Sequence, residues 1–150
     1  MDDFSLSPGT ANAYGLIQGR ANRIEPGKRP VSSMIPIVVL HHHHAWLATG
    51  SPGGSKIITT VFQLLINLID YHMGLATATE SPRIHSQLFP DVIAIEQGVS
   101  PDTMSLLTKM GHHLKQSKTQ GSLQSVMQMD NGWLYGYSDT RRLGAGVATY

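Results

Sequence analysis

The sequence predicts an α+β fold, because runs with the period of a strand and runs with the period of a helix both occur along it. Apolar and β-branched residues gather in short strand-like runs at 35–40, 45–49, 92–96, 123–129 and 133–137. Two longer stretches, 56–73 and 100–111, carry helical patterns. Low charge in the first two runs predicts strands that are buried on both faces.

The longest helical pattern, Lys56 to Met73, is apolar around most of its circumference and therefore predicts a buried helix. Ser55 stands near its N-cap position, and Gly74 supplies a residue that commonly closes a helix. A short helix is expected over 75–80. The pattern over 100–111 begins with Ser, Pro and Asp, which are typical of a helix start, and ends at a glycine.

Two turns join the predicted strands into hairpins. Asn131-Gly132 supplies residues that tolerate the positive φ angles of a tight hairpin turn. His41 to His44 separate the first two strands. Alternate imidazoles can converge on a metal ion, but no Asp, Glu or Cys stands beside them. We therefore expect an exposed turn, with no metal and no other cofactor.

The chain of 150 residues has the length of one ordinary domain, so a single domain is expected over 1–150. Residues 5–33 are rich in Gly, Pro, Asn and Ser and show no sustained period. They predict one long loop ahead of a core over 34–150. A loop of this length inside a domain is usually functional or disordered.

Composition excludes several classes of function. The formal net charge is +1, and the pairs Lys28-Arg29 and Arg141-Arg142 are expected to be solvated or locally paired, so no nucleic-acid partner is expected. The absence of cysteine excludes disulfides, thiolate metal sites and a cysteine nucleophile. The N-terminus has no targeting pattern, and polar residues interrupt the longest apolar stretch, so no membrane segment is expected.

The link between the second strand and the long helix is the first candidate for chemistry. Gly53 and Gly54 would present backbone N–H groups at a helix N-terminus, where unpaired donors and the helix dipole favour negative charge. Such donors can stabilise the oxyanion of an acyl-transfer intermediate. Taken alone, the two glycines fit an ordinary tight turn better than an oxyanion site.

Two polar pairs near the ends of the long loop form the second candidate. Asp2-Asp3 offers carboxylates at one end, and Ser32-Ser33 offers hydroxyls at the other. Taken singly, such pairs are ordinary cap or turn residues. Together with an oxyanion turn, they suit a ligand that carries an amino group, a carboxylate and a reacting carbonyl. A glutamyl group has these features.

Several motifs, in register over the whole chain, resemble the small subunit of gamma-glutamyltransferases, also called glutathione hydrolases. The two most specific are Lys-Arg-Pro-Val-Ser-Ser-Met at 28–34 and Thr-Gly-Ser-Pro-Gly-Gly-Ser at 49–55. The others are Met1-Asp2-Asp3-Phe4, Pro8-Gly9, Asn12-Ala13-Tyr14-Gly15-Leu16, Ile58-Thr59-Thr60, Pro82-Arg83, Ser100-Pro101-Asp102-Thr103 and Tyr135-Gly136.

This resemblance implies a role for each candidate residue. Asp3 would hold the α-amino group of a γ-glutamyl moiety, and Ser32 and Ser33 would hold its α-carboxylate. The N–H groups of Gly53 and Gly54 would stabilise the oxyanion.

The resemblance also implies a partial αββα sandwich of the N-terminal nucleophile hydrolase type. In that family a precursor cleaves itself, and the newly exposed threonine attacks the γ-carbonyl with its own α-amino group as base. Tyr14 corresponds to an aromatic residue of a lid loop that covers the site in some bacterial members. The threonine-bearing segment and the large subunit lie outside these 150 residues, so the isolated chain is expected to be inactive.

The expected partners are a γ-glutamyl substrate such as glutathione, the large subunit and the threonine-bearing segment. Exposed strand edges would also invite self-association. The resemblance implies a periplasmic or secreted location. Two alternatives stay open: an acylase or poly-γ-glutamate hydrolase of the same fold, and a non-catalytic remnant that binds a glutamate-like ligand or a partner chain.

Overall fold

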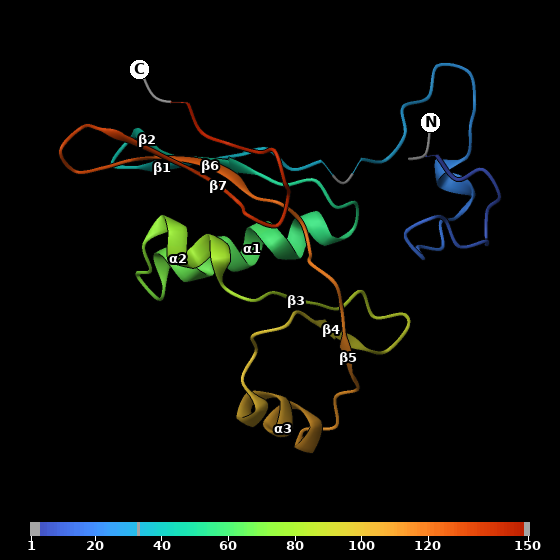
Figure 1. Cartoon of the computed structure of the whole chain (residues 1–150). Coiled ribbons are helices and arrows are strands. Elements are labelled where there is room, and N and C mark those ends of the chain that lie inside the picture. Colours follow the sequence, from blue (N-terminus) through green and yellow to red (C-terminus); the bar gives the residue numbers. More distant parts are fainter. Residues whose placement is uncertain (1–3, 33, 149–150) are drawn as a thin grey trace. The chain divides into compact units, whose positions relative to one another are not determined.

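The computed structural model describes residues 4–32 and 34–148, and the chain divides into two compact units that meet between Met34 and Ile35. The first unit contains one turn of 3-10 helix, η1 (Arg20–Asn22). The second contains every strand and α-helix of the described residues (Figure 1). The single domain expected over 1–150 stays a prediction.

The first unit is organised by backbone hydrogen bonds between distant parts of the loop. The Ser5 N–H donates to the Asn22 carbonyl at 2.9 Å, and the Gly9 N–H donates to the Gln18 carbonyl at 2.9 Å. The buried side chain of Asn22 accepts from the Val31 N–H at 3.0 Å. The long loop therefore folds back on itself without regular strands or α-helices in its described residues.

The second unit has a four-stranded antiparallel sheet in the order β1-β2-β6-β7. A smaller sheet has the order β3-β4-β5, with β4 and β5 parallel. Helices α1 and α2 lie on one face of the larger sheet, and α3 connects β4 to β5 (Figure 1). The bounds are β1 (Ile37–His41), β2 (His44–Gly50), α1 (Lys56–Ile69), α2 (Leu75–Glu80), β3 (Ile84–His85), β4 (Ile93–Ile95), α3 (Pro101–Lys109), β5 (Leu114–Gln116), β6 (Gln124–Gln128) and β7 (Leu134–Ser138).

The core lies between the four-stranded sheet and α1. Leu47 of β2 belongs to one core cluster with Val61 and Leu64 of α1, and each of the three residues is only 1% exposed. On β1, by contrast, Val38 and Leu40 remain 62% and 64% exposed. Because side chains alternate along a strand, one face of the sheet meets the helices and the other does not. The expectation that the first two strands are buried on both faces is wrong for this chain.

The long helix begins where the sequence predicts and ends earlier. Ser55 is the N-cap residue, but α1 stops at Ile69 and not at Met73. His72 adopts a left-handed conformation (φ 51°), and the Met73 N–H donates to the Asn67 carbonyl at 2.9 Å. A histidine thus takes the helix-closing position that glycine commonly fills. Gly74 instead precedes α2 as its N-cap.

The remaining predicted helices and strands are present, with small shifts at their ends. At α3, the Ser100 hydroxyl accepts from the Thr103 N–H at 3.1 Å, as its N-cap position predicts. The turn before β7 differs from the prediction, because Gly132 has a positive φ (84°) and Asn131 does not. The Gly132 N–H donates to the Met129 carbonyl at 2.9 Å, which gives a longer turn closed by a left-handed glycine. Strands β3 and β5 were not predicted.

Four histidines form the first hairpin. His41 pairs with His44, and the two residues between them both adopt positive φ angles, 48° at His42 and 65° at His43. This is the geometry of a two-residue type I′ turn, which normally contains Asn and Gly. All four side chains are exposed, so the prediction of an exposed turn is confirmed.

We predict that His43→Gly stabilises the chain, because a side chain in the left-handed region costs about 1 kcal/mol that glycine does not incur. The free energy of unfolding, measured by urea titration, should rise by about that amount. His112→Gly provides the control, since His112 is exposed and lies outside the positive-φ positions. A stabilisation of equal size in the control variant would contradict the turn explanation.

A cluster of buried charges joins distant segments of the second unit. Arg83, which is 3% exposed, donates to Asp139 at 2.6 Å, and Arg141 donates to Glu96 at 2.8 Å. Each guanidinium also donates to the Thr79 carbonyl, at 2.6 Å from Arg83 and at 3.0 Å from Arg141. The Glu80 carboxylate lies 3.8 Å from Arg141 as well, so two positive side chains meet three negative ones. Arg141 is locally paired, as expected, because it donates to Asp139 at 3.2 Å, and it also donates to Glu96, which lies 45 residues away in sequence.

Asp139 is the most enclosed member of this cluster. Burial raises the pKa of its carboxyl, but hydrogen bonds from the N–H groups of Arg141 and Leu123 and from the Arg83 guanidinium outweigh burial. The pKa therefore lies below its usual value of 3.8. A carboxyl with a lowered pKa in the folded state stabilises that state above its unfolded pKa, and this contribution is lost as the pH falls through the folded pKa.

We predict that Asp139→Asn lowers the free energy of unfolding at pH 7 by about 3 kcal/mol, because it leaves the buried Arg83 without its charged partner. Urea titration measures the change. Asp130→Asn, in an exposed turn, is the matched control and should stay within about 0.5 kcal/mol of the unsubstituted chain.

The pH dependence gives a second readout of the same substitution. The stability difference between the unsubstituted chain and Asp139→Asn should be constant above about pH 5 and should narrow as the pH falls below about 3.8. A difference that persists unchanged to about pH 2 would show that the Asp139 charge does not carry the effect.

Candidate active site

The link between β2 and α1 presents two glycine N–H groups side by side. Gly53 has φ 141° and Gly54 has φ 57°, which are conformations that side chains disfavour. Their carbonyls accept from the first turn of α1, from Lys56 at 3.2 Å and from Ile57 at 3.1 Å. Within the described part of the chain, neither glycine N–H donates a hydrogen bond. The two donors therefore remain unused at the positive end of a helix.

The surroundings of this turn also suit an anion. No acidic residue lies in the first turn of α1, and Lys56 is its first residue. A developing negative charge would therefore meet the helix dipole without a nearby carboxylate from that turn. These features are compatible with an anion at the start of α1, and the oxyanion role of the two glycines stays a prediction.

The segment after β5 packs against Ser51, just before the glycine turn, and hydrogen-bonds to it. The Ser122 N–H donates to the Ser51 hydroxyl at 2.9 Å. Gly121 has φ 68°, and a Cβ placed on it would lie 2.7 Å from the Ser51 oxygen and 2.8 Å from Thr60. Only glycine permits this close approach, so the two segments interlock at Ser51.

Ser55 supports the turn from the other side. Its hydroxyl does not cap α1 but donates to the side-chain oxygen of Gln87 at 3.0 Å. A serine at an N-cap ordinarily accepts from the N–H two or three residues later. Here the hydroxyl instead links the start of α1 to the segment that follows β3.

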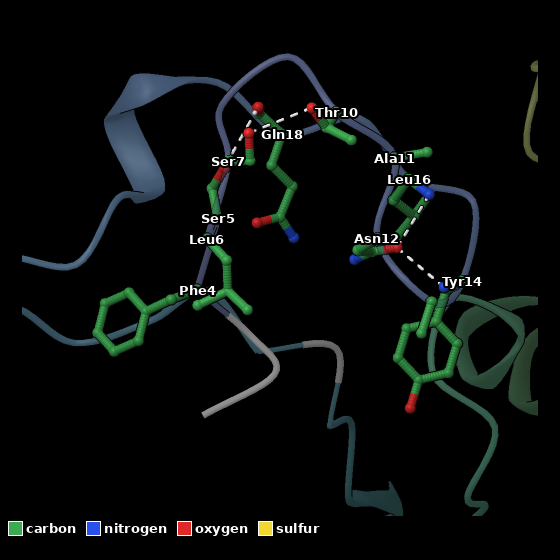
Figure 2. Close-up of a pocket in the computed structure, with 11 residues that line it drawn as sticks. Phe4, Ser5, Leu6, Ser7, Thr10, Ala11, Asn12, Tyr14, Leu16 and Gln18 are labelled. Atoms are coloured by element: carbon green, nitrogen blue, oxygen red, sulfur yellow. Dashed lines mark hydrogen bonds between the residues drawn. The ribbon is translucent and has the colours of Figure 1, made fainter.

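The first unit contains a pocket of its own, between Phe4 and Gln18 (Figure 2). It has a volume of about 230 Å³. The side-chain oxygen of Asn12 accepts from the Tyr14 N–H at 2.9 Å and from the Leu16 N–H at 3.0 Å, which fixes the turn that carries Tyr14. The Tyr14 side chain is 50% exposed at the pocket wall. The loop thus has a defined internal structure, and its pocket is lined by both apolar and polar side chains.

The sequence-predicted site residues fall into both units. Ser32 lies in the first unit, is exposed, and accepts from the Met34 N–H at 3.2 Å through its hydroxyl. Asp3 and Ser33 lie outside the described residues. The convergence of these three residues on one ligand stays a prediction, as do the roles expected for Tyr14 and for the glycines of the second unit.

Residues 4–32 and 34–148 contain no group of three or more His, Cys, Asp and Glu side chains placed to hold a metal ion. The same part of the chain has no helix with the length and apolar character needed to span a membrane. Sequence reasoning missed Ser51, Gln87 and Gly121 as supports of the turn. The Ser51 position inside the glycine motif was the one available signal, since Gln87 and Gly121 are distant in sequence.

Comparison with known proteins identifies relatives of this architecture. The family described as gamma-glutamyltranspeptidase matches residues 1–149. The glutathione hydrolase proenzyme of Escherichia coli (strain K12) is 49% identical over 150 residues, which is 100% of this chain and 26% of that protein. The chain therefore spans about a quarter of the length of this relative.

Solved structures agree with the sequence comparison. A mutant of the Helicobacter pylori gamma-glutamyltranspeptidase superposes with a TM-score of 0.89 and 44% identity, over 95% of this chain and 78% of that chain. The Pseudomonas nitroreducens gamma-glutamyltranspeptidase complexed with L-DON gives a TM-score of 0.88 and 38% identity, over 99% and 79% of the two chains.

These similarities agree with the predicted fold class. The helices and two sheets form an α+β fold, and it is part of the N-terminal nucleophile hydrolase fold of the matched structures. The match covers nearly every residue of the chain, and its most specific motifs include the glycine turn. On this evidence the chain belongs to the gamma-glutamyltranspeptidase family.

Proposed function

We propose that this chain supplies the oxyanion donors and part of the glutamyl-binding site of an enzyme that transfers or hydrolyses γ-glutamyl groups of glutathione and related compounds. The observation that carries the proposal is the pair of unused N–H groups at Gly53 and Gly54, in a family member, at the start of α1. The whole activity needs the threonine-bearing segment and the large subunit as partners.

The proposed chemistry proceeds through a threonyl acyl-enzyme. The threonine oxygen forms a bond to the γ-carbonyl carbon while its proton passes to the threonine α-amino group. The carbonyl oxygen takes up negative charge, which the two glycine N–H groups stabilise. The carbon–nitrogen bond then breaks, and the leaving amine takes the proton. Water or an amino acid amine next bonds to the ester carbon and gives up a proton to the threonine α-amino group. The bond to the threonine oxygen then breaks, that oxygen takes the proton, and the glutamyl group leaves as glutamate or as a new γ-glutamyl amide.

The glutamyl head would be held by residues of the first unit. Asp3 is proposed to bind the α-amino group, and Ser32 and Ser33 the α-carboxylate, because their charges and donors match those groups. Tyr14 is proposed to belong to a lid over the bound substrate, and its half-exposed side chain beside a pocket supports this role. A periplasmic or secreted location is proposed from the family alone.

A chimaera tests the function directly. Residues 1–150 replace the matching quarter of the Escherichia coli proenzyme, and turnover is measured with γ-glutamyl-p-nitroanilide. We expect activity from the chimaera and none from a polypeptide of residues 1–150 alone, because the nucleophile comes from the other segment. Turnover by the polypeptide alone, or an inactive chimaera that folds and assembles, would contradict the proposal.

We predict that Gly53→Ala lowers kcat of the chimaera about 100-fold. An alanine disfavours φ 141°, so the backbone would rotate and the N–H group would no longer be oriented toward the oxyanion. KM should change little, since this donor acts after the substrate has bound. A Cβ at Gly53 meets no atom closer than 3.7 Å, so steric overlap does not explain the loss.

Gly98→Ala is the matched control for backbone strain. Gly98 also has a positive φ (108°), and a Cβ there lies 3.5 Å from Pro82, an ordinary contact. Both variants therefore carry a strained alanine, but only one lies in the proposed oxyanion turn. Equal losses of kcat in the two variants would count against the role of Gly53.

A further inference from the structure

A polar stripe on α1 binds the segment that follows α2. Ser55, Thr59 and Gln63 lie four residues apart and therefore share one face of the helix. Gln63 exchanges two hydrogen bonds with the backbone of Ile84, both at 2.9 Å. Thr59 lies 2.9 Å from Nδ1 of His85, and Ser55 donates to Gln87 at 3.0 Å. Three positions along the helix thus contact Ile84, His85 and Gln87 of one extended segment.

At the end of this stripe nearest the glycine turn, side-chain contacts link Thr59 to His85, His85 to Gln87, and Gln87 to Ser55. His85 is 7% exposed, and its Nε2 lies 3.3 Å from the Gln87 side-chain oxygen. That oxygen already accepts from the Ser55 hydroxyl, so a hydrogen bond to it requires the ring proton on Nε2. With that tautomer Nδ1 is an acceptor, and it shares the single Thr59 hydroxyl proton with the Lys56 carbonyl, which lies 3.1 Å from the same oxygen. Gln87 is thus the acceptor that joins His85 to Ser55.

The backbone directly after Gln87 is strained. Leu88 has φ 71°, although its side chain is large, and the Phe89 N–H donates back to the Gln87 carbonyl at 2.9 Å. Such a three-residue turn is rare and costly, and it persists where the surroundings determine it. The side-chain bonds of Gln87 are among the contacts that keep this strained turn against the start of α1.

We propose that Gln87 and His85 are positioning residues for the oxyanion turn, acting through the Ser55 hydroxyl on the adjacent Gly54 and Gly53 N–H groups. This inference rests on the proposed function. Because Ser55 does not cap its helix, its bond to Gln87 is the side-chain contact that orients the first residue after the glycine pair. A donor that is displaced by a fraction of an ångström stabilises the transition state less, while substrate binding is little affected.

The kinetic test compares variants of the chimaera with γ-glutamyl-p-nitroanilide. Gln87→Met keeps the size of the side chain and removes the acceptor, and Ser55→Ala removes the donor. Each should lower kcat about tenfold and leave KM within about twofold. The double variant should be no worse than either single variant, because both remove the same bond. Gln63→Met breaks the far end of the stripe and should leave kcat unchanged.

A structural readout keeps the proposal testable without catalysis. In the full 150-residue chain, the amide ¹H–¹⁵N resonances of Gly53 and Gly54 should shift on Gln87→Met and stay in place on Gln63→Met. An inactive unsubstituted chimaera together with these shifts would overturn the proposed function and support the coupling. Unmoved glycine resonances, additive losses of kcat, or an equal loss from Gln63→Met would overturn the coupling.

Discussion

The burial of four charged side chains is the constraint on which the second unit depends. Transfer of a charge from water to the interior costs several kcal/mol per ion, so each must meet its partner with good geometry. Arg83 and Asp139 lie 56 residues apart in sequence, and Arg141 and Glu96 lie 45 apart. Their pairing therefore brings the end of α2, the end of β4 and the end of β7 to one point. Asp139 accepts from both arginines, so its loss would remove a charged partner from each of them.

This cluster also determines where the glycine turn can lie. Arg83 donates to the Gln120 carbonyl at 2.6 Å, and the Gln120 N–H donates to Glu96. The next two residues, Gly121 and Ser122, carry the close approach and the hydrogen bond to Ser51. Three consecutive residues, 120–122, therefore connect the charge cluster to the glycine turn through hydrogen bonds and close packing. Backbone and side-chain groups both take part in these bonds, and none of the bonds needs a ligand to form.

The sequence predicted those elements whose signals are local. Ser100 and its following proline marked a helix start, and the apolar pattern after Ser55 marked α1. Strands β3 and β5 are two and three residues long, too short for a period to appear, so they were missed. Arg141 was expected to be solvated or locally paired, and it does pair with Asp139, but no local signal indicated its second partner Glu96, 45 residues away. Helix α1 ends earlier than predicted because His72 adopts the left-handed conformation that closes a helix. This conformation can be adopted by residues other than glycine, so the sequence did not indicate it.

The candidate site shows the same limit more sharply. Two glycines before a helix fit a tight turn or an oxyanion site, and the sequence alone favoured the tight turn. The difference lies in where hydrogen bonds go. In a turn with no further role, the backbone N–H and C=O groups would hydrogen-bond within the turn itself. A serine at the N-cap would accept a hydrogen bond from an N–H of the first helical turn. Here the glycine carbonyls are used, the glycine N–H groups are not used within the described chain, and the Ser55 hydroxyl is diverted to Gln87. This distribution of bonds leaves donors free at the one place where an acyl-transfer reaction would need them, and it supports the oxyanion interpretation over the simple turn.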